Sequence, residues 1–315
     1  MRTRTIGSLK VSVVGLGCNN FGGRLDAAGT ANVVQAALDA GINFFDTADI
    51  YGGTKSEEYL GLALRGRRDQ VVLASKFGMP LDEHRRGASP QYIKRAIEDS
   101  LRRLGTDRID LYQLHRPDPD VPIADTLGAL DELVRAGKVR EIGSSNFSTT
   151  QIRAADAAVR PGAARFVSVQ NEYSLLHRDP ERGVLDECEA RGVAFLPYFP
   201  LASGVLSGKY RRGQPAPQGA RLSASKSPLA SRFLSDRMLA IAEALTQFAE
   251  ARGHSLLELA HSWLLAQRAV ASVISGATSA EQVRANAAAA SWQLSADELG
   301  EIDSIAPRSE LAAGD

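Results

Sequence analysis

Residues 109–145 read IDLYQLHRPDPDVPIADTLGALDELVRAGKVREIGSS, and this stretch decides the fold. The β-rich run at 109–115 predicts a buried strand, and the run at 139–145 predicts a second one. Between them, residues 124–138 have the mixed apolar and charged pattern of an amphipathic helix. A strand, a helix and a strand in succession favour parallel pairing, so this stretch predicts one βαβ unit.

The same alternation extends along the whole chain. It predicts eight strands, at residues 13–17, 42–47, 71–75, 109–115, 139–145, 166–171, 194–198 and 271–275. It predicts further helices at 30–41, 89–105 and 282–291. Because the strands are nearly continuous apolar runs, both faces of their sheet are expected to be covered. Eight such units predict an α/β protein, a single (β/α)8 TIM barrel domain over residues 1–315, rather than an open doubly wound sheet.

Three segments stand outside this repeat. Residues 3–12 contain two short strand-like pieces around Gly7 and Ser8, which predict an N-terminal β-hairpin that plugs the lower end of the barrel. Residues 199–230 form a long loop rich in Gly, Ser, Pro and Arg, and a loop of this length in a compact domain is usually functional or disordered. Residues 255–268 predict an extra amphipathic helix before the last strand.

Composition and charge exclude several classes of protein. The 37 basic and 37 acidic residues cancel, so nothing indicates binding to a nucleic acid or an anionic membrane. Cys18 and Cys188 are too far apart in sequence to resemble a disulfide framework. The N-terminus lacks the pattern of a signal peptide, and no apolar run approaches the roughly 20 residues that cross a bilayer. A cytoplasmic protein is expected, and the sequence does not predict its oligomeric state.

Polar side chains follow the predicted strands at the points where these end. Active sites of (β/α)8 barrels lie at the carboxyl ends of the strands, so these side chains are predicted to share one rim. Taken singly, each has an ordinary structural explanation as a turn residue, a solvated lysine or a satisfied core histidine. Together they are harder to dismiss. They are Asp46, Tyr51, Lys76, His115, Ser145, Asn146, Gln170 and Tyr198.

Four of these residues form a coherent set for carbonyl chemistry. A tyrosine hydroxyl has an ordinary pKa of about 10, and a neighbouring ammonium such as Lys76 is expected to lower it. Asp46 would hold Lys76 in place and keep it charged. His115 would donate a hydrogen bond to a carbonyl oxygen, and Tyr51 would deliver a proton to it as general acid. No cluster has metal-ligand spacing, and the hydride needs a bound cofactor because side chains supply none.

These residues and seven segments around them resemble the aldo-keto reductase family over essentially the whole chain. The segments FDTADIYG, ASKFG and DLYQLHRPD resemble those that hold the family's catalytic Asp, Tyr, Lys and His. Four further segments resemble the family's cofactor-binding segments, in the right order: GSSNF, VQNEYS, PYFPLASGVLSGKY and VISGATSAEQVRANA. The Rossmann fingerprint is absent, since GLGCNNFGG lacks the G-x-G-x-x-G spacing.

The resemblance implies NADPH-dependent reduction of aldehydes or ketones without a metal. Asp46, Tyr51, Lys76 and His115 would be the catalytic tetrad. The nicotinamide carboxamide would be bound by Ser145, Asn146 and Gln170, with Tyr198 stacked on the ring. The remaining cofactor contacts would be Gly17, Leu201, Ser203, Gly204, Lys209, Gly276, Gln282 and Asn286.

Two positions depart from the family pattern. Phe199 stands where many relatives have Ser, so one polar contact to the cofactor is missing. Ser279 stands where many relatives carry Lys or Arg to bind the 2′-phosphate of NADPH. Arg284 compensates for this loss or is an ordinary exposed helix residue. NADPH is the expected cofactor, and NADH is the alternative.

The substrate is predicted only as a class. The mainly apolar loops suit an aromatic or medium-sized carbonyl. Arg116 suits a negative group on that substrate or, alternatively, pairs with Asp118 at the rim. Two other functions remain open: a redox-sensing regulatory subunit with little turnover, and an isomerase or aldolase in which Lys76 forms a Schiff base. The expected substrate-lining residues are Asn20, Phe21, Ile50, Phe77, Met79, Arg116 and Phe199.

Overall fold

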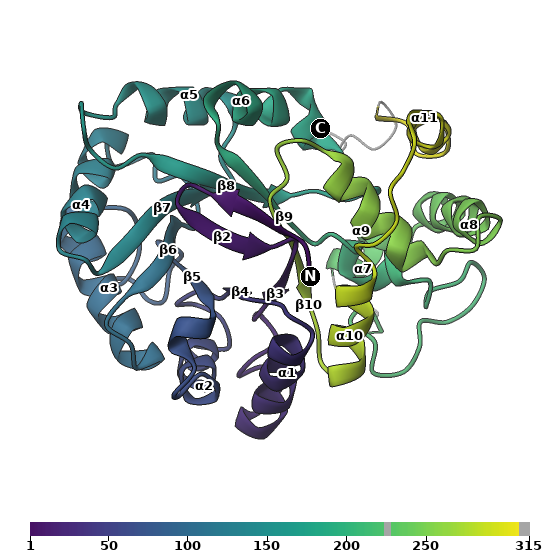
Figure 1. The fold of residues 1–315 in the computed structure, drawn as a ribbon, viewed down its shortest axis with the longest axis horizontal. Coiled ribbons are helices and arrows are strands. Elements are labelled where there is room, and N and C mark those ends of the chain that lie inside the picture. Colours follow the sequence, from purple (N-terminus) through teal and green to yellow (C-terminus); the bar gives the residue numbers. More distant parts are fainter. Residues whose placement is uncertain (224–227, 309–315) are drawn as a thin grey trace.

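The computed structural model describes residues 1–223 and 228–308 and shows an eight-stranded parallel barrel surrounded by helices (Figure 1). Apart from β10, which lies beside β3, the strands follow one another around the sheet in chain order. Each neighbouring pair is parallel, as the repeated βαβ pattern predicts. The strands are β3 (Val14–Gly17), β4 (Phe44–Asp46), β5 (Val72–Phe77), β6 (Ile109–Leu114), β7 (Val139–Ser145), β8 (Phe166–Glu172), β9 (Ala194–Tyr198) and β10 (Val273–Gly276).

The barrel closes between β9 and the residues just before β10. The amide of Phe195 donates to the carbonyl of Ala269 at 2.7 Å, and the amide of Ala271 donates to the carbonyl of Phe195 at 3.0 Å. Residues 269–271 are therefore used for closure, and pairing of the last strand with β3 starts only at Val273. This explains why β10 begins two residues later than the sequence predicts.

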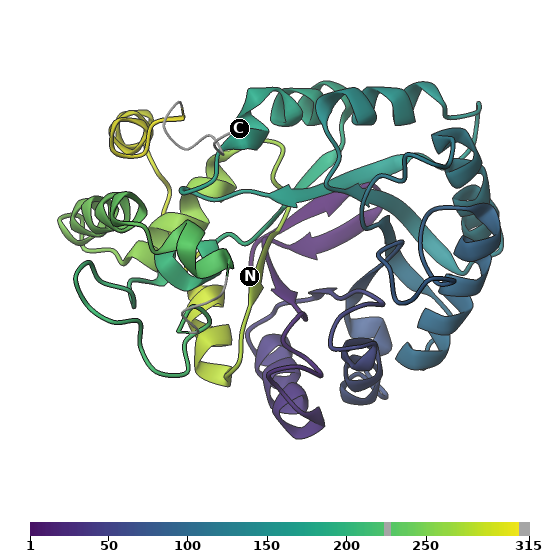
Figure 2. The same ribbon diagram turned by 180° about the vertical axis from the view of Figure 1, so that it is seen from behind.

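Helices follow the strands and pack on the outside of the barrel (Figure 2). Ser89 caps the amide of Tyr92, Pro90 occupies the first helical turn, and Gly105 ends the helix in a left-handed conformation, so this helix, α3, has strong start and stop signals. The helices of the repeat are α1 (Ala27–Asp39), α2 (Lys55–Ala63), α3 (Pro90–Leu104), α4 (Ile123–Arg135), α5 (Thr149–Ala157), α6 (Val184–Arg191) and α10 (Ala280–Ala288).

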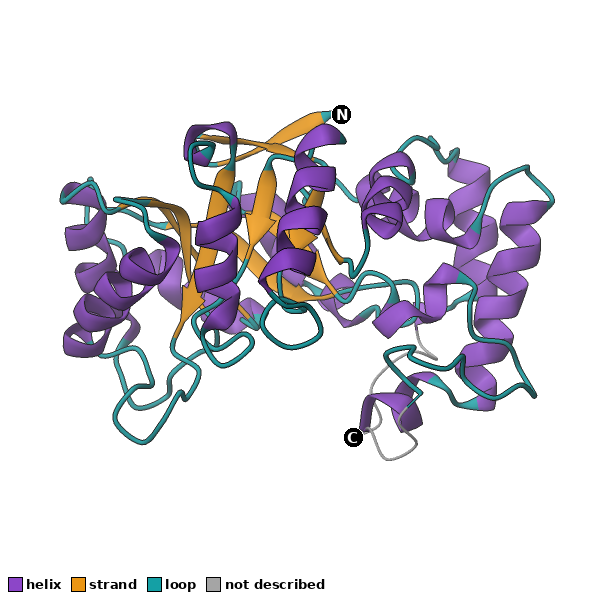
Figure 3. Ribbon diagram, turned by 90° about the horizontal axis from the view of Figure 1, so that it is seen from below, coloured by secondary structure: helices purple, strands orange, loops and turns teal. Residues whose placement is uncertain are grey.

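The N-terminal hairpin lies across the end of the barrel at which the strands begin, as predicted (Figure 3). Its strands are β1 (Thr3–Ile6) and β2 (Leu9–Ser12), which pair antiparallel. Ile6, Leu9 and Val11 are buried in one cluster with side chains from β4, β6, β9 and β10. The hairpin therefore seals the lower core and leaves the opposite end of the barrel for a site.

The last third of the chain adds helices beyond the repeat. The predicted extra helix is α9 (Leu256–Ala266), and it is buried along most of its length. The segment 199–230 differs from the expectation of a plain loop, because it contains the 3-10 turn η3 (Ala202–Ser207) and the start of α7 (Pro228–Phe233). The other elements are η1 (Arg68–Gln70), η2 (Asp179–Arg182), α8 (Asp236–Glu250) and α11 (Ala296–Ile305).

Candidate active site

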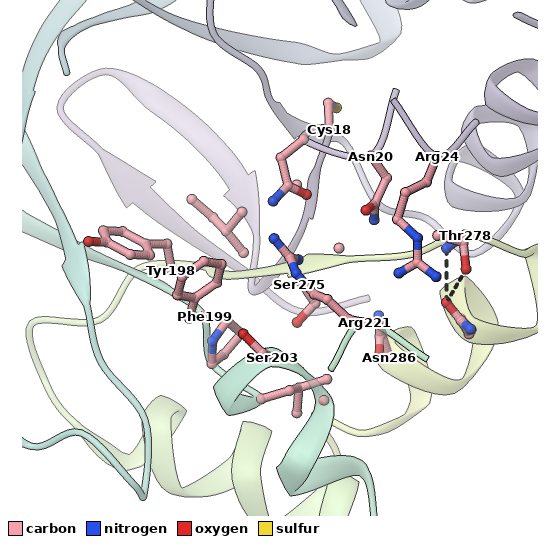
Figure 4. A pocket seen from close by; sticks show the side chains of 18 of the residues that line it. Cys18, Asn20, Arg24, Tyr198, Phe199, Ser203, Arg221, Ser275, Thr278 and Asn286 are labelled. Carbon is pink, nitrogen blue, oxygen red and sulfur yellow. Dashed lines mark hydrogen bonds between the residues drawn. The ribbon is translucent and has the colours of Figure 1, made fainter. Parts of the chain in front are cut away.

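A cavity of about 680 Å³ opens at the carboxyl ends of the strands. Its walls come from the barrel centre, from the loop after β3, from residues 199–221 and from the start of α10 (Figure 4). Parallel strands bring their carboxyl ends to one rim, so residues far apart in sequence meet here. The register places Gly17 beside Asp46 and Ser145 beside Gln170, as neighbours across paired strands.

Asp46, Lys76 and Tyr51 form one connected group at the bottom of this cavity. The Lys76 Nζ donates to Asp46 Oδ2 at 2.6 Å and to the carbonyl of Thr47 at 2.9 Å. The Tyr51 hydroxyl lies 3.5 Å from the same Nζ. The Lys76 side chain is fully buried, so its charge depends on the carboxylate beside it. The predicted contact between Asp46 and Lys76 is present.

The second oxygen of Asp46 is also satisfied. Gln170 Nε2 donates to Asp46 Oδ1 at 2.9 Å, and Gln113 Nε2 donates to the same atom at 3.2 Å. The side-chain amide of Gln170 is therefore engaged with Asp46 rather than free to bind a ligand. Gln113 was missed in the sequence because it lies inside a strand, with no turn or motif to mark it.

The pKa of Tyr51 differs from the expectation. Burial raises the pKa of its hydroxyl, and this effect exceeds the lowering by Lys76, so the pKa lies above its ordinary value. Burial would lower the pKa of Lys76, but Asp46 and Tyr51 oppose it, and the net shift is upward. The group therefore holds a protonated phenol beside a charged ammonium, which is the state that a proton donor requires.

His115 faces Tyr51 and is neutral. Burial, with the nearby charges of Lys76 and Arg116, lowers its pKa to about 3. Its amide donates to the carbonyl of Phe77 at 2.8 Å, and its carbonyl accepts from Asn146 Nδ2 at 2.9 Å, so the backbone on both sides is fixed. Nδ1 is buried without a hydrogen-bond partner among the described residues. A neutral imidazole keeps one N–H, which can be donated to a substrate oxygen.

Ser145, Asn146, Gln170 and Tyr198 share one wall of the cavity, and they bond to one another. Ser145 Oγ donates to the carbonyl of Gln170 at 2.7 Å, and the hydroxyl of Tyr198 donates to Asn146 Oδ1 at 2.8 Å. Asn146 has a φ of 60°, a conformation that asparagine tolerates better than most residues. The predicted residues are thus brought together, with their polar groups already paired.

The turn after β9 supplies a polar and strained edge. Ser203 and Gly204 have φ values of 58° and 100°, and both line the cavity. The Ser203 hydroxyl is buried without a partner among the described residues. A Cβ at Gly204 would lie 2.9 Å from the Nζ of Lys209, so glycine lets this lysine pass close to the turn. Leu201 and Lys209 line the same stretch of wall.

Two arginines that the sequence did not single out lie beside Lys209. Arg24, after β3, donates to the carbonyl of Gly219 at 2.8 Å, and Arg221 lies over the ring of Phe199 at 5.1 Å. Both point into the cavity in Figure 4. Burial, followed by the charge of Arg24, lowers the pKa of both Lys209 and Arg221. We call Arg24, Lys209 and Arg221 the cationic cluster.

The far end of the cavity is formed by the start of α10. Gln282 Oε1 accepts hydrogen bonds from the amide and the hydroxyl of Thr278. Ser279 caps this helix by accepting from the amide of Gln282, which explains the serine there in structural terms. Arg284 is exposed and is not among the residues that line the cavity, whereas Asn286 is buried and lines it.

The substrate-lining predictions are partly corrected. Asn20, Met79, Arg116 and Phe199 line the cavity, as do Gly17 and Gly276 of the cofactor prediction. Phe21 and Phe77 do not line it, because both side chains are fully buried in the core. Phe77 stacks on Tyr112 with ring centroids 4.8 Å apart. Ile50 is half-buried and lies outside the lining as well.

Arg116 is not paired with Asp118 in the described part of the chain. Asp118 instead accepts hydrogen bonds from the amides of Ala88 and Asp120. The guanidinium of Arg116 is exposed at the edge of the cavity, next to His115. Residues that the sequence missed also include Cys18, Asn19, Leu257, Ser275 and Thr278.

Comparison with known proteins gives a consistent result. The model of the aldo/keto reductase family matches residues 13–307. Protein tas of Escherichia coli (strain K12) is 34% identical over 334 aligned residues, which cover 95% of each chain. The aldo-keto reductase YhdN of Bacillus subtilis (strain 168) is 34% identical over 306 residues, covering 94% of this chain and 90% of that one.

A solved structure is similar over nearly the same length. The aldo-keto reductase AKR11C1 from Bacillus halodurans, in its holo form, superposes with a TM-score of 0.81 and 34% sequence identity. The match covers 97% of this chain and 96% of that one. In residues 1–223 and 228–308, no helix is long and apolar enough to span a bilayer. In the same residues, no three His, Cys, Asp or Glu side chains are grouped to hold a metal ion.

Proposed function

The chain belongs to the aldo-keto reductase family and is an NAD(P)H-dependent oxidoreductase, and from this premise we propose that it reduces aldehydes or ketones to alcohols with Tyr51 as general acid. The observation that carries the proposal is the buried series Asp46–Lys76–Tyr51, which ends on a protonated hydroxyl at the cavity. A reduced nicotinamide bound in the cavity would supply the hydride.

The side chains have separate duties in this proposal. His115, neutral and edge-on to Tyr51, donates a hydrogen bond that orients the carbonyl oxygen. Tyr51 transfers its proton to that oxygen as negative charge develops on it. Lys76, held charged by Asp46, stabilises the phenolate that remains. The closed series of contacts limits reorganisation during the transfer.

The donor set of the cavity fits a dinucleotide. Its polar lining includes Tyr51 and Asn286, and the cationic cluster lines the same cavity. Among the described residues, the members of the cationic cluster have no acidic partner, and the Ser203 hydroxyl beside them is unpaired. We propose that Lys209 and Ser203 bind the pyrophosphate. The nicotinamide would lie against Asn146 and Tyr198.

We propose NADPH as the cofactor. Arg24 and Arg221 would bind its 2′-phosphate, which Ser279 cannot do as a basic residue would. An arginine–phosphate pair is a strong determinant of ligand choice because the guanidinium presents two parallel donors. Arg24 and Thr278 line the same cavity as Gln282 and Asn286, which are proposed to meet the adenine (Figure 4). Arg284 is exposed elsewhere and does not serve this purpose.

The proposed substrate is an aromatic or medium-sized carbonyl compound with an anionic group. Phe199 and Met79 provide an apolar wall, and the exposed Arg116 lines the cavity next to His115 without a carboxylate partner among the described residues. A carboxylate on the substrate would complete this pair. We also propose a cytoplasmic, single-domain enzyme, since both cysteines are buried and unpaired.

The test is Tyr51→Phe, assayed with NADPH and 4-nitrobenzaldehyde. We expect turnover to fall at least about 100-fold while NADPH still quenches the protein fluorescence with unchanged affinity, since the proton donor alone is lost. Tyr59→Phe, at a half-buried tyrosine of α2 that does not line the cavity, is the matched control. Unchanged turnover in Tyr51→Phe would exclude the proton-donor role, and negligible turnover of the wild type on a carbonyl panel would favour a regulatory protein.

A Schiff-base mechanism finds no support in the geometry. Such chemistry needs a neutral amine with access to the substrate, and the Lys76 side chain is fully buried and bonded to Asp46. Its pKa is raised rather than lowered. Borohydride in the presence of an aldehyde should therefore leave no adduct on Lys76.

A further inference from the structure

Asp49 lies in the loop that joins Asp46 to Tyr51, and its role is not explained by the proposed chemistry. The backbone of this loop is tied to Lys76 at two points. The amide of Asp49 donates to the carbonyl of Lys76 at 3.1 Å, and the Lys76 Nζ donates to the carbonyl of Thr47 at 2.9 Å. The position of Tyr51 relative to Lys76 therefore depends on these few residues.

The carboxyl of Asp49 is in an unusual environment. The residue is 1% exposed, and both carboxyl oxygens are buried without a hydrogen-bond partner among the described residues. It is not among the residues that line the cavity. A buried ionised carboxylate without partners costs several kcal/mol, so such a group normally keeps its proton.

The charges of the neighbouring elements lead to the same conclusion. Lys76 and Arg103 are the cations nearest to Asp49, and each is paired with another carboxylate. Lys76 is engaged with Asp46, and Arg103 pairs with Glu57 at 2.7 Å. Glu57 also accepts a hydrogen bond from Ser75 at 2.5 Å. Asp49 is therefore the carboxyl of this group that has no cation paired with it. Burial, followed by the charge of Glu57, raises its pKa to about 7.

Every element packed around Asp49 contributes to this balance. Glu57 comes from α2, Arg103 and Tyr92 come from α3, Tyr112 comes from β6 and Lys76 comes from β5. Burial and the charge of Glu57 favour the neutral form of Asp49, and they outweigh Arg103, the backbone amide of Ile50 and Lys76, which favour the ionised form. The Tyr92 hydroxyl is also buried without a partner in the described residues, so no hydrogen bond from this residue stabilises an ionised Asp49.

We propose that Asp49 is a positioning residue for the proton donor: its neutral carboxyl keeps the Thr47–Tyr51 loop against Lys76, and its ionisation at rising pH displaces the loop and lowers turnover. An ionised Asp49 must acquire a hydrogen-bond partner or water, which requires the residue to move. Because the backbone amide of Asp49 donates to the carbonyl of Lys76, such a movement would break that hydrogen bond. The kinetic part of this inference rests on the proposed function, whereas the ionisation itself does not.

No group of the proposed catalytic set titrates in the same range. His115 has a pKa of about 3, and the pKa values of Tyr51 and Lys76 lie above their ordinary values near 10. A loss of turnover around neutral pH is therefore assigned to Asp49. This separation makes the pH profile a readout that a merely structural residue would not change.

The experiment compares kcat for carbonyl reduction between pH 5.5 and 9 in the wild type and in Asp49→Asn. We expect the wild type to lose turnover above about pH 7, approaching tenfold per pH unit, because only the protonated form is active. Asp49→Asn should match the wild type at pH 5.5 and keep its turnover at pH 8.5. The same decline in Asp49→Asn and in the wild type would overturn the proposal.

Two further variants guard against an indirect effect. Asp110→Asn removes another buried carboxyl, which lies at the opposite end of β6 and pairs with Arg68 and Arg140; it should leave the decline where it is in the wild type. Glu57→Gln should move the decline to lower pH, because it removes a charge that raises the pKa of Asp49. A decline that does not move in Glu57→Gln would contradict the assignment.

A measurement that needs no turnover separates this inference from the proposed function. In the cofactor-free protein labelled with 13C at aspartate carboxyls, one resonance should titrate near pH 7 in the wild type and in Asp110→Asn. This resonance should be absent in Asp49→Asn, and its midpoint should shift to lower pH in Glu57→Gln. If Asp49→Asn does not fold, the shift in Glu57→Gln provides the test. If the resonance titrates but the protein reduces no carbonyl, the ionisation of Asp49 near pH 7 stands and only its effect on turnover is excluded. If no such resonance titrates in the wild type, the proposal is overturned.

Discussion

The rings of Tyr51 and His115 meet edge to face, with centroids 5.8 Å apart and planes at 81°. The two side chains come from successive parts of the rim, the loop after β4 and the residue after β6, and they enclose the space where a carbonyl oxygen would be bound. Because one is a protonated phenol and the other a neutral imidazole, both offer a hydrogen to that oxygen.

The neutrality of His115 leads to a prediction about pH. Since its pKa is about 3, turnover should show no acidic decline between pH 5 and 7 from this residue. His115→Gln, which keeps an N–H donor, should lose less activity than His115→Ala, for which a loss of roughly 100-fold is expected. Initial rates at pH 5, 6 and 7 with saturating NADPH would test both points, and an acidic decline that disappears in His115→Gln would contradict the first.

The buried ion pair leads to a prediction about stability. Asp46→Asn leaves the Lys76 ammonium without its carboxylate and should cost about 3–5 kcal/mol in unfolding free energy. The double variant Asp46→Asn/Lys76→Met should recover much of that loss, because no buried charge remains, yet it should stay inactive. Urea unfolding monitored by tryptophan fluorescence gives the free energies. Additive losses in the double variant would show that the two side chains are not coupled.

The cationic cluster leads to a prediction about cofactor choice. Arg24→Ala should weaken NADPH binding about 10- to 100-fold and NADH binding much less, because a charge-assisted bond to phosphate contributes roughly 1.5–3 kcal/mol. Arg284→Ala is the matched control, since this arginine is exposed outside the cavity. Fluorescence titration with both cofactors provides the ratio of affinities. An equal loss for NADPH and NADH would place Arg24 at the pyrophosphate instead.

The environment of Asp49 leads to a prediction about stability and pH. The folded pKa of about 7 exceeds the unfolded value of about 3.9, so this group stabilises the fold fully below pH 4, and that contribution is lost as the pH rises through 7. The difference between the two pKa values corresponds to at most about 4 kcal/mol. Asp49→Asn should therefore unfold less readily than the wild type at pH 8 and equally at pH 4.

Buried histidines act in the opposite direction, so the comparison must be between variants. Burial lowers the pKa of His261 to about 4, and the unfolded chain binds its proton more readily, so this contribution to stability is absent at low pH and is gained as the pH rises through 6.5. The pH profile of the wild-type unfolding free energy therefore contains both the gain from His261 and the loss from Asp49. Subtracting the profile of Asp49→Asn isolates the carboxyl, and a difference that is constant with pH would contradict the folded pKa.

The sequence predicts the fold well because its signals are local. Eight apolar runs alternate with helices, and start and stop signals such as Ser89 and Gly105 coincide with the observed ends of α3. The rim is predictable for the same reason, since a polar residue that ends an apolar strand must face the carboxyl end of the barrel. Asp46, Lys76 and His115 are predictable in this way.

What the sequence does not predict depends on distant neighbours. Phe21 and Phe77 adjoin the rim in sequence, yet both side chains pack into the core. The sign of the net pKa shift of Tyr51 depends on how deeply it is buried, which no local pattern reveals. Arg24 and Arg221 approach each other only because two long loops fold over the same cavity, and neither belongs to a spaced motif.

The closure of the barrel has a consequence for its motions. Among the residues that the structure describes, Phe195 is the one residue of β9 whose amide and carbonyl bond to the residues before β10. The pairs β6–β7 and β8–β9 share longer ladders. Segments with few backbone hydrogen bonds open first in the native state. We therefore expect the amides of Phe195 and Ala271 to exchange with deuterium sooner than those of β5 and β6. Local opening at this seam would increase the mobility of the part of the barrel next to residues 199–221. It would leave Asp46, Lys76 and Tyr51 in place.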